Sequence, residues 1–214
     1  MSNTKSRILV AIGLIAVLAL IWGVFGPLGV FWLCIIVGVG MMAEFVRVLW
    51  LAPREVMFNG KNLAVFACFL ALLCADLGAL VTLGRRPMII LMILAIVCAA
   101  DVCAWLFGRI IGGDKMWERI SEHKTWAGQI FGVIGGTAVA VLYGYLTMHV
   151  FAPQLLWIGI SVSLSSQYGD LTASFIKRRL KIKDFSRVLG AHGGIIDRTD
   201  GWIYVLPLIW MILA

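Results

Sequence analysis

The sequence predicts an all-α polytopic membrane protein with six to seven transmembrane helices and two polar cytoplasmic loops. The chain has 214 residues, of which 62% are hydrophobic and only 14% are charged. Soluble domains average roughly 45–50% apolar and about 25% charged residues. A membrane-spanning helix needs roughly 20 mostly apolar residues, and much of the chain consists of apolar runs of about that length. These observations exclude an ordinary water-soluble domain, a disordered chain and a disulfide-rich secreted module.

Apolar runs follow one another along the whole chain. A Gly26-Pro27 pair separates the first two runs, and such a pair is typical of a tight turn between helices. The last run has thirteen residues, which is short for a span unless its helix begins earlier, near Ile195. We therefore count six spans, and a seventh that needs this extension. The runs are residues 8–25, 28–45, 63–83, 88–107, 126–150, 155–173 and 202–214.

The lysines and arginines predict which loops face the cytoplasm, because short cytoplasmic loops are enriched in these residues. With the N-terminus inside, sixteen of the eighteen lie on the cytoplasmic side, and only Arg85 and Arg86 lie on the other. Both long polar loops, residues 108–125 and 174–201, then face the cytoplasm. Water-soluble reactants are expected to arrive from that side.

Acidic residues at membrane depth are costly and therefore indicate function more strongly than surface charges do. Glu44 precedes Arg47 by three residues, so an ion pair within one helix is the preferred interpretation for it. Asp76 either lines a cavity or forms a hydrogen bond between helices. Asp101 and Asp170 are stronger candidates for a functional site, because each lies shortly before a polar cytoplasmic loop.

The sixth apolar run becomes too polar near its end to face lipid. If its helix continues beyond the run, one helical face carries a carboxylate, a hydroxyl and two ammonium groups. Such a face suits a metal-bridged phosphate better than a solvated surface. The residues of this face are Asp170, Ser174, Lys177 and Lys181.

Residues 174–200 form the most highly charged segment of the chain. Attraction of a basic loop to anionic lipid explains its lysines and arginines but not its other residues. The paired glycines Gly193 and Gly194 allow backbone amides to approach phosphate oxygens. Asp197 and Asp200 can bind a hard cation such as Mg²⁺ through oxygen, together with substrate phosphates. The segment therefore predicts a site for phosphate and Mg²⁺.

Two stretches of the chain resemble one protein family. Residues 174–200 contain Ser-Phe-Ile-Lys-Arg, then Lys-Asp-Phe-Ser-Arg-Val-Leu-Gly, and then His-Gly-Gly-Ile-Ile-Asp-Arg-Thr-Asp. This segment, hereafter the signature segment, resembles the signature of the phosphatidate cytidylyltransferases, the CDP-diacylglycerol synthases, at every constrained position over 27 residues. Residues 101–109 resemble the Asp-x-x-Ala-aromatic-x-x-Gly-Arg stretch of that family. Residues 121–128 resemble its Ser-Pro-Lys-Lys-Thr-x-Glu-Gly loop.

The resemblance covers about half of the chain, and three residues in the loop depart from the family pattern. Glu122 and His123 stand where the family has Pro-Lys, and Ala127 stands where it usually has Glu. We expect a single integral-membrane domain over the whole sequence. Its N-terminal helices occupy residues 1–100, and its catalytic half occupies residues 101–214.

The resemblance implies an activity in phospholipid biosynthesis. CTP and phosphatidic acid would react to give CDP-diacylglycerol and pyrophosphate, with Mg²⁺ as the cofactor and a second cation as an option. A homodimer is an expectation by analogy, and no nucleic acid partner is expected. The implied location is a bacterial inner membrane, with the active site facing the cytoplasm.

The resemblance and the spacing together assign roles to individual residues. Asp170 and Asp197 are the first choice as metal ligands, and Asp200 is a third. His192 is expected to shape the glycine turn rather than to act as a base. The predicted catalytic residues are Asp170, Ser174, Lys177, Lys183, His192, Asp197 and Arg198. The predicted substrate-binding residues are Asp101, Arg109, Lys124, Thr125, Arg178, Gly193 and Gly194.

Other functions stay open from the sequence. A related transferase could use CTP with another lipid phosphate, such as an isoprenoid phosphate or an ether lipid, and a lipid kinase is a more distant option. A non-catalytic paralogue that binds anionic lipid belongs to a different class. A transporter is disfavoured, because the polar residues cluster on the cytoplasmic side rather than at the middle of the membrane.

Overall fold

Helices dominate the computed structural model and follow the apolar runs of the sequence. The structure describes residues 3–57, 59–118, 120–148, 152–190 and 193–213, with side chains from residue 19 onward except those of residues 122, 123 and 148. The elements are α1 (Asn3–Leu51), α2 (Arg54–Met57), α3 (Gly60–Leu83), α4 (Pro87–Ile110), β1 (Lys115–Trp117), β2 (Ser121–Thr125), α5 (Trp126–Met148), α6 (Gln154–Leu180), α7 (Ile196–Thr199), the 3-10 turn η2 (Asp200–Trp202) and α8 (Val205–Leu213).

Within the described residues, four helices are long and apolar enough to cross a membrane. They are Ala19–Leu51 of α1, all of α3 and α4, and Trp126–Thr147 of α5. The predicted class, an all-α polytopic membrane protein, is confirmed, although the number of spans stays a prediction. One departure is the antiparallel hairpin β1–β2, which pairs Lys115 with Thr125 inside the first polar loop.

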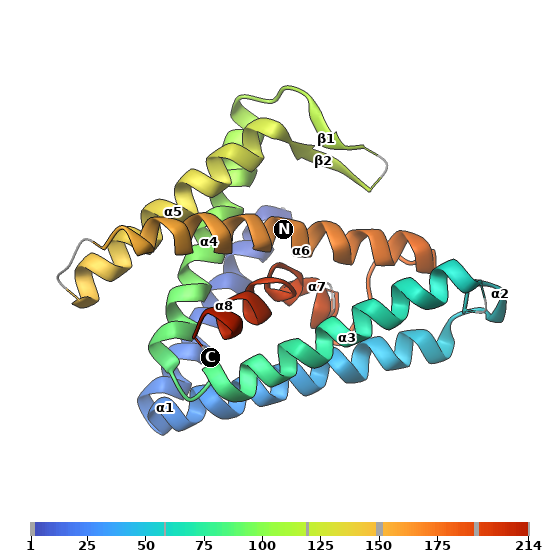
Figure 1. Cartoon of the computed structure of the whole chain (residues 1–214), viewed down its shortest axis with the longest axis horizontal. Helices are drawn as coiled ribbons and strands as arrows, with labels where there is room; N and C mark the ends of the chain where they lie inside the picture. Colours follow the sequence, from blue (N-terminus) through green and yellow to red (C-terminus); the bar gives the residue numbers. More distant parts are fainter. Residues whose placement is uncertain (1–2, 58, 119, 149–151, 191–192, 214) are drawn as a thin grey trace.

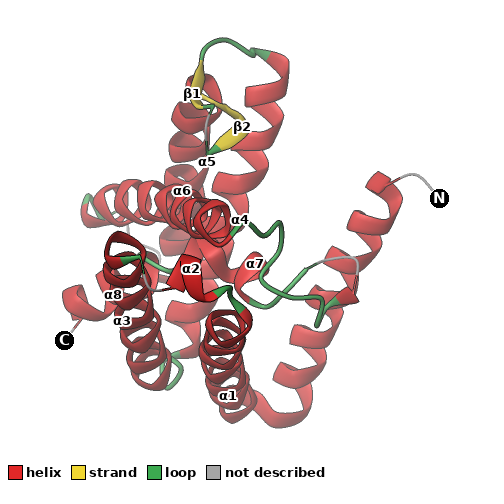
Figure 2. Cartoon of the chain, turned by 90° about the vertical axis from the view of Figure 1, so that its right-hand side faces the viewer, coloured by secondary structure: helices red, strands yellow, loops and turns green. Residues whose placement is uncertain are grey.

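α1 changes direction at Gly26, where φ is 56° and ψ is −145°. A residue with a Cβ rarely adopts this conformation, and the following Pro27 cannot donate a helical hydrogen bond. The predicted break between the first two apolar runs is therefore present. Figure 2 shows the two segments of α1 diverging from this point.

Small residues bring α4, α5 and α6 close together. Glycines recur every fourth residue along α5, and a Cβ added at Gly132 would lie 3.0 Å from the Ala100 carbonyl of α4 and 2.6 Å from Gln167 Nε2 of α6. The Gln167 amide also donates to the carbonyl of Gln129 at 3.3 Å. A second group consists of α1 and α3, which run side by side in Figure 1.

The polar segments that the sequence places in the cytoplasm gather at one end of the molecule. Arg179 at the end of α6 donates to Asn62 Oδ1 at the start of α3, over 2.9 Å. The end of α1 and residues 182–188 line a common hollow. In Figure 1, α2, the end of α6 and the tip of the hairpin point to the same side, whereas the α3–α4 turn lies opposite. The two long polar loops thus lie at the same end of the molecule, and which side of the membrane this end faces stays a prediction.

The continuous C-terminal helix that a seventh span would need is absent from the described residues. α8 has nine residues, which at about 1.5 Å per residue cover less than half of a hydrocarbon core roughly 30 Å thick. No continuous helix extends back to Ile195, because α7 and η2 are separate short elements. The interruption brings Asp200 against α6, where a side chain in place of Gly169 would collide with the Asp200 carbonyl.

The predicted polar face of α6 is also shorter than expected. The helix ends at Leu180, and Lys181 adopts a left-handed conformation with φ 57° as its C-terminal cap. Lys181 therefore does not continue the face formed by Asp170, Ser174 and Lys177. The chain turns there into the loop that leads to α7.

Candidate active site

Three carboxylates from separate elements meet next to the polar end of α6. Asp170 lies on α6, Asp101 lies near the end of α4, and Asp200 begins η2. Asp200 interacts electrostatically with both of the others, and its carboxyl is in hydrogen-bonding contact with that of Asp170. We call these three residues the carboxylate cluster. Two of them, Asp101 and Asp170, are the acidic residues that the sequence singled out at membrane depth.

Two lysines flank the carboxylate cluster. Lys124, from strand β2, places its Nζ 2.7 Å from Asp170 Oδ2 and 3.2 Å from the carbonyl of Gln167. Its charge also acts on Asp101. Lys177 lies two turns after Asp170 on α6, and its charge acts on Asp200. The hairpin and α6 thus each bring one positive charge to the acidic group.

Asp200 lies outside the membrane-spanning helices, in the turn between α7 and α8. The residue as a whole is partly exposed, but its carboxyl group lies among protein atoms. Burial, together with the neighbouring Asp170 carboxylate, raises the pKa of Asp200 well above its usual range, and Lys177 opposes this effect. Two carboxyl groups in this position compete for one proton or share a cation.

Asp197 has a different environment from the cluster. Its Oδ1 accepts from Lys177 Nζ at 2.7 Å, and its Oδ2 accepts from the amides of Phe185 and Gly194 at 2.8 and 3.0 Å. Its side chain is 5% exposed. Both oxygens are therefore engaged by protein groups, and the structure does not bring Asp197 into the cluster as a ligand beside Asp170.

Glu44 of α1 is the second carboxylate that holds the signature segment. It accepts hydrogen bonds from the amides of Ile195 and Ile196, at 3.2 and 2.7 Å, and from the Ser186 hydroxyl. The predicted ion pair with Arg47 is absent among the described side chains. The correction has a physical cause, since a buried carboxylate is stabilised by several converging amide donors. We call Glu44 and Asp197 the loop anchors.

The paired glycines accommodate the loop anchors. Gly193 has φ 81°, and a Cβ there would lie 3.1 Å from Asp197 Oδ2. A Cβ at Gly194 would collide with the Glu44 carboxylate. The Gly194 amide is bonded to Asp197 and is thus not open to phosphate, contrary to the sequence interpretation. The residue that explains the need for glycine here, Glu44, lies on α1, far from Gly194 in the sequence.

The sequence matches a known protein family over nearly its whole length. A sequence profile described as "Cytidylyltransferase family" matches residues 4–214. The chain belongs to this family. A phosphatidate cytidylyltransferase of Brucella suis is 37% identical over 126 residues, which cover 57% of this chain and 45% of that protein. One of Staphylococcus epidermidis is 38% identical over 125 residues, 58% of this chain and 48% of that protein.

The chain thus spans about half the length of these curated relatives. A relative with the same name from Rickettsia bellii is 29% identical over 223 aligned positions, which cover 99% of this chain and 91% of that protein. The resemblance to the phosphatidate cytidylyltransferases, which the signature segment indicated, is therefore confirmed.

Two other predicted site residues, Thr125 and Arg109, contact residues close to them in the sequence. Thr125 is buried, and its Oγ1 accepts from the Gly128 amide at 3.2 Å, which caps the start of α5. The Arg109 guanidinium lies 6.0 Å from the centroid of the Trp105 ring on the same helix.

The remaining predicted site residues fall in different places. Ser174 lies one turn after Asp170 on α6, and Arg198 lies on α7. Lys183 lines the hollow at the end of α1, whose lining includes no member of the carboxylate cluster. His192 lies outside the described residues.

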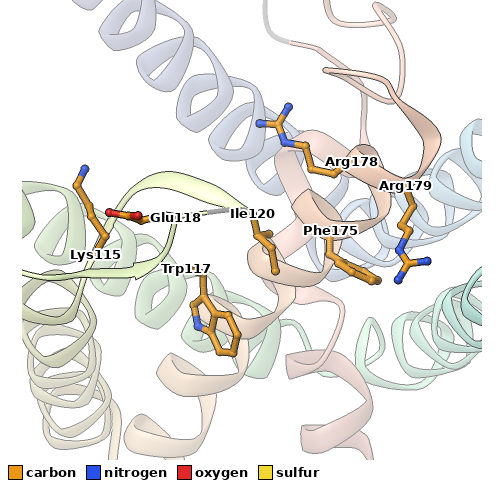
Figure 3. A pocket seen from close by; sticks show the side chains of 7 residues that line it. All are labelled: Lys115, Trp117, Glu118, Ile120, Phe175, Arg178 and Arg179. Atoms are coloured by element: carbon orange, nitrogen blue, oxygen red, sulfur yellow. The ribbon is translucent and has the colours of Figure 1, made fainter.

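A hollow of about 720 Å³ lies between the hairpin and the last turns of α6. In the view of Figure 3, Ile120 lies between Trp117 and Phe175. Lys115 and Glu118 project from the hairpin, and Arg178 and Arg179 project from α6. The hollow therefore combines three apolar side chains with three cationic ones and one carboxylate, Glu118. Because Phe175 is five residues after Asp170, it lies within two helical turns of the cluster.

The carboxylate oxygens of Asp170 and Asp200 suit a hard cation whose other ligands come from substrate. Among the described residues, no group of three or more His, Cys, Asp or Glu side chains is arranged to enclose a metal. Asp170 and Asp200, however, are in contact and offer only oxygen. Mg²⁺ typically takes one or two carboxylates and completes its coordination with phosphates and water.

Proposed function

We propose that this protein transfers the cytidylyl group of CTP to phosphatidic acid, giving CDP-diacylglycerol and pyrophosphate. The observation that carries the proposal is the carboxylate cluster between Lys124 and Lys177, at the polar end of a membrane protein of the cytidylyltransferase family. The names of the Brucella, Staphylococcus and Rickettsia relatives support the same activity.

The chemistry requires no covalent intermediate on the protein. An oxygen of the lipid phosphate attacks the α-phosphorus of CTP, and the bond from that phosphorus to the bridging oxygen of pyrophosphate breaks. The electron pair leaves with pyrophosphate, and the lipid phosphate becomes part of a diphosphate. Because both reactants are polyanions, the main task of the site is to neutralise and position charge.

We place Mg²⁺ on Asp170 and Asp200, with Asp101 beside them. Bound there, the cation would neutralise charge on the triphosphate as pyrophosphate leaves. Asp197, predicted from the sequence as a ligand, is instead a positioning residue in this proposal, because it holds Lys177 at 2.7 Å. Lys177 and Lys124, next to the carboxylate cluster, then bind phosphate oxygens.

We place CTP in the hollow shown in Figure 3. The Trp117 indole, which is 49% exposed, offers a flat apolar face to a pyrimidine base. Arg178, which has an exposed side chain, lies at the edge of the same hollow and can bind phosphate oxygens. In this placement the triphosphate would extend along α6 from the hollow toward Asp170, which precedes Phe175 by five residues.

We further propose that the site faces the cytoplasm of a bacterial inner membrane. The support is the charge asymmetry of the sequence and the gathering of α2, the hairpin and the end of α6 on one side of the molecule. CTP is a cytoplasmic solute, and phosphatidic acid can reach the same level from within the bilayer.

A turnover assay tests the proposed function directly. Purified protein in detergent–lipid micelles would be given cytosine-labelled CTP, phosphatidic acid and Mg²⁺, with Asp170→Asn as the control. We expect label in a lipid product and an equal amount of released pyrophosphate, both absent with the variant. Product formed only with an isoprenoid phosphate or an ether lipid would replace phosphatidic acid as the substrate. Absence of product with every lipid phosphate would overturn the proposal.

A further inference from the structure

A second basic hollow lies apart from the carboxylate cluster, at the end of α1. Its volume is about 630 Å³, and it is formed where residues 182–188 of the signature segment meet the last turns of α1. Three of the side chains that line it are cationic: Arg47 of α1, Lys183 and Arg187. Its lining contains one acidic residue, Asp184, so the hollow carries an excess of positive charge.

The cations of this hollow are available to a ligand. Arg47, Lys183 and Arg187 are exposed, and none forms an ion pair with a described acidic residue. Lys177, in the same signature segment, is by contrast paired with Asp197. Three converging cations with one nearby carboxylate repel one another, and an anion bound among them would remove this repulsion.

The surroundings of the hollow belong to a membrane surface rather than to open water. Trp50, next to the end of α1, is 84% exposed, and tryptophan is enriched at the level of lipid headgroups. Leu51 and Val188 line the hollow and are 62% and 64% exposed. Apolar side chains this exposed are stable when acyl chains cover them.

We propose that this hollow, hereafter the α1 headgroup site, binds the phosphate of an anionic membrane phospholipid. Arg47, Lys183 and Arg187 would bind the phosphate oxygens, while Leu51 and Val188 contact the adjoining glycerol and acyl carbons. The headgroup can be a phosphodiester, so the bound lipid need not be a reactant. The inference stands on this hollow alone and does not depend on the proposed transferase activity.

The α1 headgroup site is joined to the signature segment by covalent structure and hydrogen bonds. Phe185, within the hollow's loop, donates its amide to Asp197, and Ser186 donates to Glu44. The Phe185 ring is buried against Phe69, with their centroids 6.2 Å apart. A bound headgroup would therefore contact the same loop that the loop anchors hold in place.

Native mass spectrometry of the purified full chain tests the site without measuring turnover. Delipidated protein in detergent would be titrated with dioleoyl phosphatidylglycerol, with phosphatidylcholine and with inorganic phosphate. The test variant is Arg47→Gln combined with Arg187→Gln. The matched control is Arg54→Gln combined with Lys61→Gln, which removes the same charge from exposed side chains at the same end of the molecule but outside the hollow.

We expect one phosphatidylglycerol to bind wild type and the control pair alike, and to bind the test pair about thirtyfold more weakly, roughly fivefold for each arginine. Equal weakening by the control pair would overturn the site in favour of general attraction of a basic surface. Equal affinity for phosphatidylcholine would show that charge is not recognised, and displacement of the lipid by millimolar phosphate would assign the hollow to a soluble anion. Each of these three results would contradict the proposal.

Discussion

The carboxylate cluster and the loop anchors both consist of carboxyl groups, but the two sets have different surroundings and different roles. Glu44 and Asp197 each accept several hydrogen bonds, mostly from backbone amides, and little capacity to bind remains. Asp170 and Asp200 face each other: Asp170 pairs with Lys124 at 2.7 Å, and Asp200 Oδ1 accepts from the adjacent Gly201 amide at 3.0 Å. The anchors are held mainly by converging amides, whereas the cluster places two carboxyl groups in contact with each other, an arrangement that a bound cation would stabilise.

This difference separates folding from chemistry within one short segment. Asp197 and Asp200 are three residues apart, yet Asp197 points into the loop and Asp200 toward α6. The anchors stabilise the loop at the expense of their own reactivity. The cluster keeps carboxylates together at an electrostatic cost, which is the arrangement expected of a site that awaits a cation and polyanionic substrates.

The largest expected effect comes from the carboxylate cluster. Asp170→Asn removes one of the two charges that we assign to Mg²⁺, and it should lower kcat by about a thousandfold, near the upper end for a single electrostatic group. The thermal unfolding temperature in detergent should stay equal to that of wild type or rise, because the repulsion from Asp200 is removed. Normal turnover in this variant would remove Asp170 from the metal site.

Glu44→Ala tests the opposite half of the comparison. It leaves the buried amides of Ile195 and Ile196 without their acceptor, at about 1–3 kcal/mol for each unsatisfied group. We expect a clearly lower unfolding temperature in detergent and faster proteolysis within residues 182–195. Turnover should fall as a consequence, in proportion to the loss of the ordered loop.

The matched control for Glu44→Ala is Ala43→Ser on the same turn of α1, where the side chain is exposed. It should change neither stability nor proteolysis. Glu44→Gln retains one acceptor oxygen and should recover part of the lost stability. If Glu44→Ala lowered turnover without changing proteolysis or unfolding, Glu44 would belong to the chemistry and the distinction between anchors and cluster would fail.

The sequence predicted the cluster better than the anchors, for a physical reason. A carboxylate at membrane depth before a polar loop is unusual in one dimension, so Asp101 and Asp170 could be found from hydropathy alone. Glu44 had a cation three residues away, and this local partner was an adequate explanation until α7 was seen beside α1. The amides of Gly194 and Phe185 donate to Asp197 because of the geometry of the loop. The spacing of residues along the sequence does not determine that geometry. The length of α8 was missed because an apolar run shows composition, whereas η2 interrupts the helix through tertiary contacts.

Lys124→Ala should have a smaller effect, of a kind that distinguishes substrate binding from structure. Lys124, on β2, makes a charge-assisted contact with Asp170 of α6. Loss of such a contact to a charged ligand costs about tenfold in affinity. We expect the KM for CTP to rise by about this factor, with the KM for the lipid unchanged. An unchanged CTP dependence would remove this strand from the nucleotide site.

Thr125→Ala is expected to have the smallest effect and examines a residue that lies directly beside Lys124. Its hydroxyl accepts from the Gly128 amide and is buried, so we assign it to the start of α5 rather than to substrate. Loss of a threonine cap costs about 1 kcal/mol of stability, and Thr125→Ser should retain most of it. The KM for CTP should stay at the wild-type value in both variants when measured below the unfolding transition. A raised KM for CTP in the stable Thr125→Ser protein would place the side chain in the substrate site and show that the cap and the site overlap at this position.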